Sequence, residues 1–369
     1  MTTTVTPLAI RELKVHDLRC HHEMVWKCEP GLNLLVGPNG SGKTTMLEAV
    51  YLMAHGRSFR QARDPDLTSH SAVAFQLQGS WQRYGPMQIK VNGKRGSITI
   101  QLQGREIQRR KDVTEGFPVL VESPQGRKII DGAAGERRRW LDALVITCYP
   151  GLAGHYERYL RSVMQRARLL RRGAGSDELD AWEYQVVHHG LPIVTARNQL
   201  LEELNELLLT EQVLTEKPLY LQLSVEPYEK QVWIERLRQK RSDDLRSGGL
   251  RFGPHCDTLA IICENREIRS AGSRGQQKLA AIALKMAECA LWERYRRLIP
   301  VLLLDDCLEA LDAGRQERLL KRLAAFAGQI LMTAPVAVVV PEGVGIAIRD
   351  LSRQLPAEMT AAGLMEEAA

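Results

Sequence analysis

The segment from Gly37 to Thr44, which reads GPNGSGKT, constrains the fold of this chain more than any other. It matches the phosphate-binding loop pattern G-x-x-x-x-G-K-S/T at every fixed position. The apolar run 32–36 before it predicts a short buried strand, and residues 45–54 carry apolar side chains at helical spacing. A strand, a loop and a helix in this order are the context that the motif requires. The alternative interpretation is a glycine-rich turn that matches by chance.

The residue types of this loop determine the chemistry that we expect from it. Glycine accepts backbone angles that side chains forbid, so successive N–H groups and the helix N-terminus can surround a polyphosphate. Lys43 is expected to reach the β- and γ-phosphates, and Thr44 is expected to place its hydroxyl on Mg²⁺. The segment predicted to bind the nucleotide, ATP, comprises Gly37, Pro38, Asn39, Gly40, Ser41, Gly42, Lys43, Thr44 and Thr45.

Composition is that of an ordinary globular protein. The 369 residues suggest two or three domains, or one domain with an inserted lobe. The formal net charge of +6 permits a polyanionic partner but does not demand one. Nothing at the threonine-rich N-terminus resembles a signal peptide, and no apolar run reaches the roughly 18 residues of a membrane span. We therefore expect a cytoplasmic protein that does not enter a membrane.

The seven cysteines are odd in number and form no C-x-x-C pair, which argues against a disulfide framework and favours a reducing compartment. Cys20, His21, His22 and Cys28 lie close together in the sequence, which raises zinc binding as an alternative. They lack paired two-residue spacing and fall in a predicted strand pair, so a structural role is favoured.

Patterning divides the chain into three parts. Residues 8–36 predict a strand hairpin, and residues 72–122 predict a β-meander with a turn at Asn92-Gly93. Beyond residue 122 the sequence becomes helical and rich in arginine, with Leu160, Met164 and Leu170 on one stripe. A second helix follows to about residue 209, with an interruption allowed at 190–192. We expect a short helical arm at 123–217, inserted into a head built from 1–122 and 218–369.

A second motif lies in the last quarter of the chain. The apolar run 301–304 ends in Asp305 and Asp306, a Walker B pattern in which a strand delivers carboxylates to a metal site. Asp305 is expected to hold Mg²⁺ through water, and Asp306 is expected to orient the attacking water. Taken alone, the two acids could instead cap a strand end.

One phosphate site needs both motifs, although they lie at opposite ends of the chain. The two ends must therefore fold together. We predict an α/β fold, an ATPase head with a mostly parallel sheet, because strands alternate with helices in both ends. Lys43, Asp305 and Asp306 are its predicted catalytic residues, and Thr44 and Asp305 its metal ligands.

These motifs, with Ser273-Arg274-Gly275-Gln276 and Glu309-Ala310-Leu311-Asp312, resemble the ABC-type ATPase heads of the SMC and RecF group. Within that group the chain is similar to the RecF family of bacterial recombination mediators. Residues 56–60, GRSFR, resemble the family's G-R-S-F-R, and residues 136–142, ERRRWLD, its E-R-R-R-F/W-L-D. The likeness covers nearly the whole chain. It departs at 253–259, GPHCDTL, where the family has G-P-H-R-D-D-L, and at 123–127, SPQGR, where the family has S-P-E-D-L.

The resemblance implies a mechanism. Ser273, Gly275 and Gln276 would complete the ATP site of a second protomer, so that ATP binding forms a homodimer and hydrolysis releases it. It also places Gln125 at the nucleotide. Because Asp306 stands where many relatives carry glutamate, we expect slow turnover, as in a switch.

The resemblance further implies partners. It predicts binding to single-stranded and gapped duplex DNA without sequence specificity, and partnership with RecR and RecO in loading RecA during gap repair, replication restart and SOS induction. Two rival functions stay open at this point. One is the ATPase subunit of a transporter, and the other is an ATP-gated scaffold or defence protein built on the same head.

Overall fold

The computed structural model describes residues 6–60, 64–94, 96–124, 129–224, 229–335 and 338–351. The chain forms two compact units, one of residues 1–127 with 292–369 and the other of residues 128–291. The first unit joins the two ends of the chain. Residues 218–291, which the sequence analysis assigns to the head, belong to the second compact unit. The functional division into head and arm stays a prediction.

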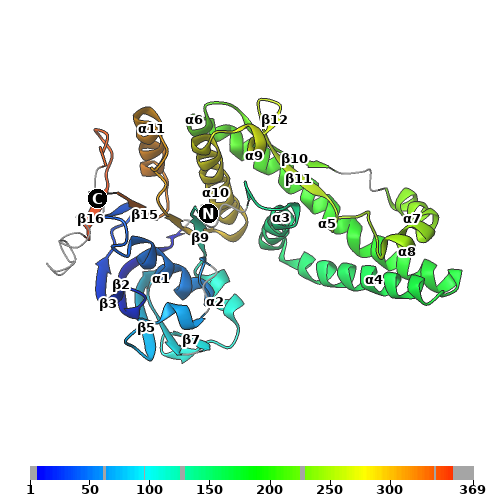
Figure 1. Ribbon diagram of the computed structural model, residues 1–369, viewed down its shortest axis with the longest axis horizontal. Coiled ribbons are helices and arrows are strands. Elements are labelled where there is room, and N and C mark those ends of the chain that lie inside the picture. The colour runs from blue at the N-terminus through cyan, green and yellow to red at the C-terminus, as the bar shows by residue number, and fades with distance from the viewer. Residues whose placement is uncertain are drawn as a thin grey trace, which may run out of the picture. The chain divides into compact units, whose positions relative to one another are not determined.

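A parallel sheet of five strands lies in the first unit, in the order β16-β4-β15-β14-β9. Figure 1 labels three of its strands, β16, β15 and β9. Every neighbouring pair is parallel, which confirms the predicted α/β fold with a parallel core. The central strands β4, β14 and β15 are buried at every position, as is typical of strands covered on both faces. The strands are β4 (Leu32–Val36), β9 (Val119–Glu122), β14 (Val301–Leu304), β15 (Ile330–Ala334) and β16 (Ala347–Asp350).

An antiparallel sheet of six strands forms the rest of this unit, in the order β3-β2-β5-β6-β7-β8. It contains the predicted hairpin and the predicted meander. A short parallel pair, β1 with β13, joins the two ends of the chain again. The strands are β1 (Thr6–Pro7), β2 (Ala9–Leu18), β3 (His21–Lys27), β5 (Ala74–Gln82), β6 (Pro86–Lys94), β7 (Ser97–Leu102), β8 (Arg105–Glu106) and β13 (Leu298–Ile299).

The turn predicted at Asn92-Gly93 is wrong. Both residues lie inside β6, whose pairing with β7 continues to Lys94 opposite Ser97. Gly93 is instead paired with Phe75 on β5, and a Cβ atom there would lie 1.9 Å from the Phe75 ring. The glycine therefore makes room for a cross-strand aromatic side chain.

Helix α1 (Lys43–His55) packs against both sheets, because its buried side chains share one core with residues of each. That core includes Leu47, Val50 and Met53 of the helix, Leu13 and Leu77 of the antiparallel sheet, and Leu303 and Leu331 of the parallel sheet. Burial of an apolar side chain stabilises the fold by roughly 1.5–3 kcal/mol at each such position. These contacts make α1 a firm base for the loop before it. The unit also contains α2 (Arg110–Gly116), α11 (Ala313–Ala324) and a 3₁₀ turn at Asp64–Leu67.

Helices dominate the second unit, in which α4 and α5 run side by side (Figure 1). A three-stranded antiparallel sheet, β10-β11-β12, accompanies them. The elements are α3 (Ala134–Cys148), a 3₁₀ turn (Pro150–Leu152), α4 (Ala153–Arg171), α5 (Ser176–Thr210), α6 (Gln212–Thr215), β10 (Leu219–Ser224), α7 (Lys230–Gln239), α8 (Arg241–Ser247), β11 (Thr258–Cys263), β12 (Arg266–Glu267), α9 (Ile268–Ala271) and α10 (Arg274–Arg296), which leads back into the first unit.

Helix α5 is continuous over 35 residues, so the interruption allowed at 190–192 does not occur. Gly190 lies where a Cβ atom would be 2.4 Å from the ring of Trp233, so the residue is small because an indole packs on it. Within the described ranges, no helix is long and apolar enough to cross a membrane.

The stripe predicted for α4 is wrong in part. Leu160 and Met164 are 48% and 56% exposed, whereas Tyr159 and Arg166 are buried. The helix turns Arg166 inward because carboxylates on α5 and α8 meet it there. Ion pairing therefore overrode the apolar pattern in orienting this helix.

Candidate nucleotide-binding site

The loop between β4 and α1 has the backbone that its glycines predict. Gly40 and Gly42 have φ values of +81° and +86°, in the left-handed region that favours glycine. The imidazole of His21, at the start of β3, donates from Nε2 to the carbonyl of Gly42 at 3.1 Å. Burial lowers the pKa of His21, so the ring is a neutral donor at pH 7. His21 therefore supports the backbone of the loop, which agrees with the structural role favoured for it from the sequence.

Lys43 is buried and folds back over its own loop. Its ammonium donates to the carbonyls of Gly37 and Pro38 at 2.8 and 2.9 Å. A lysine ammonium has three N–H donors, so this arrangement leaves one for a ligand. The position at the mouth of an anion-binding loop suits the role predicted for it.

Thr44 and Asp305 are 261 positions apart in sequence, yet the Thr44 hydroxyl donates to Asp305 Oδ1 at 2.9 Å. Thr333, at the end of β15, donates to the same carboxylate oxygen at 2.8 Å. Its own oxygen accepts from the backbone N–H of Asp306 at 2.9 Å. The fold therefore brings together Thr44 and Asp305, the two predicted Mg²⁺ ligands, with Asp306 next to them.

The electrostatics of Asp305 suit a cation ligand. The carboxylate is 4% exposed, and burial raises its pKa, with Asp306 adding to the rise, while hydrogen bonds from Thr333 and Thr44 oppose it. A buried carboxylate of this kind gains from a neighbouring cation. Its oxygen donors are of the type that Mg²⁺ prefers, so the residues present fit the metal.

A pocket of about 340 Å³ lies over the loop. Its walls combine loop residues with cations from elsewhere, which fits a polyphosphate. The lining residues are Arg19, Cys20, Asn39, Gly40, Gly42, Lys43, Thr44, Thr45, Arg60 and Asp306.

Sequence reasoning missed Arg19, Thr333 and Glu48 as parts of this site. Arg60 belongs to the GRSFR segment, which the sequence marks only as a family likeness, and Arg19 directly follows a strand and has no motif around it. A lone acid among apolar residues, Glu48 in the helix MLEAVYLMA, is a signal that could have marked a buried partner for these arginines.

The segment SRGQ begins helix α10 in the second unit. The backbone N–H of Ser273 donates to Gln276 Oε1 at 2.8 Å, and that of Gln276 donates to the Ser273 hydroxyl oxygen at 3.3 Å. This reciprocal pair is a capping box, which explains the spacing S-x-x-Q locally. Gly275 between them is buried. The hydroxyl proton of Ser273 is left to donate elsewhere, and binding in trans by this segment stays a prediction.

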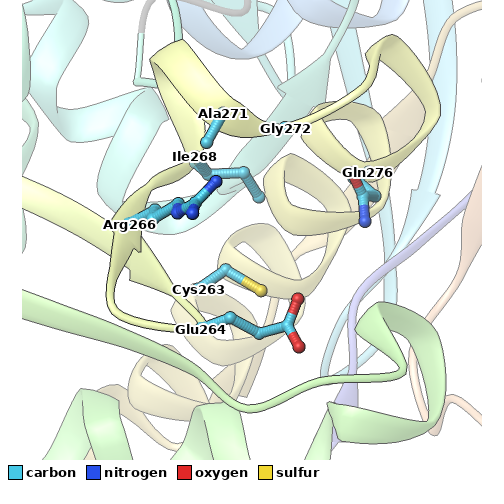
Figure 2. A pocket seen from close by; sticks show the side chains of 7 residues that line it. All are labelled: Cys263, Glu264, Arg266, Ile268, Ala271, Gly272 and Gln276. Carbon is cyan, nitrogen blue, oxygen red and sulfur yellow. The ribbon is translucent and has the colours of Figure 1, made fainter.

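Figure 2 shows a pocket of about 320 Å³ beside this helix start, between the β11–β12 turn and α10. Cys263 is the last residue of β11, Glu264 lies in the turn and Gln276 comes from the helix. Burial raises the pKa of the Cys263 thiol, so it is protonated at neutral pH. The other lining residues are Arg266, Ile268, Ala271 and Gly272.

Two further predictions end differently. Gln125 lies outside the described residues, so its place at the nucleotide stays a prediction. Arg137 of the ERRR segment is buried and donates to the carbonyls of Leu259 and Gly132 at 2.6 and 3.0 Å. Arg138 donates to the carbonyl of Asp257 at 2.7 Å, so both arginines hold α3 against the GPHCDTL segment.

The parallel sheet, the glycine-rich loop between β4 and α1, and the paired acids after β14 together define a P-loop ATPase head of the ABC and SMC class. Comparison with known sequences agrees. Residues 9–342 match the model of the family described as RecF/RecN/SMC N terminal domain.

The chain belongs to the RecF family. It is 30% identical to the "DNA replication and repair protein RecF" of Moorella thermoacetica over 338 residues, which cover 90% of this chain and 91% of the relative. It is 32% identical to the protein of the same name from Stenotrophomonas maltophilia over 341 residues, covering 89% and 93%.

Solved structures are similar as well. A structure described as the recombination mediator protein RecF-ATP in the RecFOR pathway aligns with a TM-score of 0.74 at 25% identity, covering 92% of this chain and 95% of the other. An Smc head domain from Pyrococcus furiosus aligns with a TM-score of 0.57 at 15% identity, covering 98% and 100%. The second likeness shows the shared fold alone.

Proposed function

We propose that this protein is an ATP-dependent, DNA-binding recombination mediator that acts in the cytoplasm. In this proposal it binds Mg²⁺-ATP, hydrolyses it slowly, and uses the change to switch between a dimer and separate protomers. The observation that carries the proposal is the hydrogen bond between Thr44 and Asp305 beside Lys43, because it joins both halves of a nucleotide site in one pocket.

Each residue has a role in this proposal. The loop N–H groups and Lys43 bind the β- and γ-phosphates, and Thr44 with Asp305 would hold Mg²⁺. A bound Mg²⁺ would neutralise charge on the phosphate oxygens. Asp306 orients the attacking water. Its backbone is held by Thr333 and has a φ of +48°, a strained value for a residue with a side chain, which suits a fixed functional position.

The dimer rests on the segment that begins α10. A helix N-terminus with a serine hydroxyl can bind phosphate, and in this proposal Ser273, Gly275 and Gln276 complete the site of a second copy. Two identical composite sites would give a two-fold symmetric dimer.

The DNA and protein partners follow from the family. We infer binding to single-stranded and gapped duplex DNA through backbone phosphates, and cooperation with RecR and RecO in loading RecA during gap repair, replication restart and SOS induction. The positive net charge of the chain supports phosphate contacts of this kind. The proposal includes no sequence specificity, because no segment suggests base readout.

A DNA titration tests this function. The full chain is titrated with a gapped duplex in ATP, in ADP and without nucleotide, at several salt concentrations, and its mass is followed by light scattering. We expect tighter DNA binding and a doubled mass in ATP alone, with a steep loss of affinity as salt rises. Lys43→Ala should abolish the ATP effect and leave the nucleotide-free affinity unchanged. A chain that stays monomeric and binds DNA equally in all three conditions would overturn the proposal.

A further inference from the structure

Glu48 is a fully buried carboxylate on the helix that follows the phosphate-binding loop. It is 0% exposed and lies on α1 between the apolar residues Leu47 and Ala49. A charged group in such a position needs partners that compensate for the loss of water. Two of its partners, Arg19 and Arg60, line the nucleotide pocket.

Arg19 is the closest partner. Its Nε donates to Glu48 Oε2 at 2.5 Å and its Nη2 donates to Oε1 at 2.8 Å, a two-point contact that fixes the plane of the guanidinium. Its Nη1 also donates to the carbonyl of Asp66 at 3.4 Å. The side chain of Arg19 is therefore held at three points, and it lines the pocket over the loop.

Arg60 is held less tightly and partly through a third residue. The Ser58 hydroxyl donates to Glu48 Oε1, and the same hydroxyl oxygen accepts from the backbone N–H of Arg60 at 3.0 Å. The Arg60 guanidinium lies 4.0 Å from Glu48 Oε2 and also lines the pocket. One carboxylate thus anchors two pocket arginines that come from different parts of the sequence.

The sign of the charge makes this arrangement informative. A carboxylate close to a polyphosphate site repels the ligand, so by Coulomb's law alone its removal should strengthen phosphate binding. A carboxylate that fixes cations in place has the opposite effect, because freed arginines lose the preorganisation that binding requires. The two roles therefore predict changes of opposite direction.

We propose that Glu48 is a positioning residue, which orients Arg19 directly, and Arg60 through Ser58, toward the phosphates of the bound nucleotide. The inference rests on the proposed nucleotide binding and adds a part of the site beyond the loop and the paired acids. In this proposal Arg60 of the GRSFR segment and Arg19, which follows β2, form one positively charged wall of the pocket, and Glu48 holds both arginines.

The test compares Glu48→Gln with the unchanged full chain. Gln has nearly the same shape but lacks the charge and presents an N–H₂ group to the guanidinium. Affinities for fluorescent ATP and ADP analogues are measured by titration. Loss of one charge-assisted anchor should weaken ATP binding about tenfold and ADP binding less, because fewer phosphates meet the wall.

A double-mutant cycle separates positioning from a merely structural role. Arg19→Lys keeps the charge but cannot make the two-point contact. If Glu48 acts through Arg19, the double variant should bind ATP about as weakly as the more affected single variant, and the two effects should not add. Effects that add fully would overturn this route.

Two further variants keep the test decisive. Glu12→Gln removes a half-buried carboxylate of the same unit that pairs with Lys14, and it should leave ATP affinity unchanged. If Glu48→Gln does not fold, Ser58→Ala removes the bridge between Glu48 and the backbone of Arg60, leaves the Arg19 contact in place, and should weaken ATP binding about two- to threefold. Unchanged or tighter ATP binding in the folded Glu48 or Ser58 variants would overturn the inference alone. If the protein without any substitution bound no nucleotide, both the inference and the proposed function would be overturned.

Discussion

Buried charges occur in both units, and they are treated differently in each. In the second unit Arg166 is 1% exposed and donates to Glu183 at 2.9 Å, to Asp244 at 2.8 Å and to the carbonyl of Leu237 at 2.7 Å. Both carboxylates are themselves buried, so the chain supplies the whole network.

Two buried charges of the nucleotide pocket, on Asp305 and Lys43, are held differently, whereas Glu48 pairs with Arg19 in the manner of the second unit. Asp305 is met by hydroxyl groups and by a second acid, and Lys43 is met by two carbonyls of its own loop. Burial raises the pKa of Asp305, although Thr333, Thr44 and Arg60 oppose the rise, so ionising this carboxyl group costs free energy in the folded state. The comparison teaches that the second unit uses buried ion pairs to fix helices, whereas Asp305 and Lys43 in the first unit hold their charges in a state that a ligand can improve.

The largest expected effect comes from removing Arg166, the central cation of the network in the second unit. Arg166→Met removes the cation that pairs with the buried Asp244 and leaves Glu183 paired with Arg241 alone, so the free energy of unfolding should fall by about 3–5 kcal/mol. Urea unfolding measures the loss. Arg161→Met, at an exposed position of the same helix, is the matched control and should change stability by less than about 0.5 kcal/mol. If Arg166→Met lowered the free energy of unfolding no more than the control does, the network of the second unit would not be a stabilising one.

A smaller effect of opposite sign is expected in the head. A carboxyl group whose pKa is raised in the folded state destabilises that state once it ionises. Asp305→Asn should therefore raise the melting temperature by a few degrees at pH 7 without nucleotide. The gain in melting temperature should shrink as the pH falls. It should vanish below the unfolded-state pKa of about 4, because the carboxyl group is then protonated in both the folded and the unfolded state.

The control for that experiment is an acid with the reverse shift. The backbone N–H of Arg315 lowers the pKa of Asp312 at the start of α11, so ionisation stabilises the fold there. Asp312→Asn should lower the melting temperature slightly or leave it unchanged at pH 7. Asp305→Asn should also abolish ATP hydrolysis. A melting temperature that falls in Asp305→Asn across the whole pH range would contradict the comparison.

The smallest effect concerns a hydrogen bond between two uncharged side chains of the second unit, Tyr159 and His255. The Tyr159 hydroxyl donates to His255 Nδ1 at 2.6 Å, and His255 Nε2 donates to the carbonyl of Leu250 at 3.0 Å. Burial lowers the pKa of His255, in agreement with this neutral ring. Tyr159→Phe should cost about 1 kcal/mol in urea unfolding, because one buried acceptor loses its donor. Tyr184→Phe, at a 44% exposed position, should cost nothing measurable, and equal losses in both would count against the assigned contact.

Much of the head could be predicted from the sequence. The loop at 37–44 lies between a strand and a helix as expected, and β14 ends at Leu304, directly before Asp305, as the apolar run indicated. These predictions succeeded because a phosphate-binding backbone requires glycine and lysine at fixed spacing, and such local patterns do not depend on distant residues. The family likeness also followed from motifs of this kind.

The sequence alone therefore determined the class of fold, the place of the glycine-rich loop between a strand and a helix, and the two acids at the end of a buried strand. Only the tertiary structure decided that Thr333, Arg19 and Glu48 join the site, that α4 turns Arg166 inward, and that Gly93 packs beneath Phe75 rather than in a turn. The physical reason is the same in each case. Whether a charge or a glycine is buried depends on partners contributed by remote segments, and those partners leave no periodic trace in the local sequence.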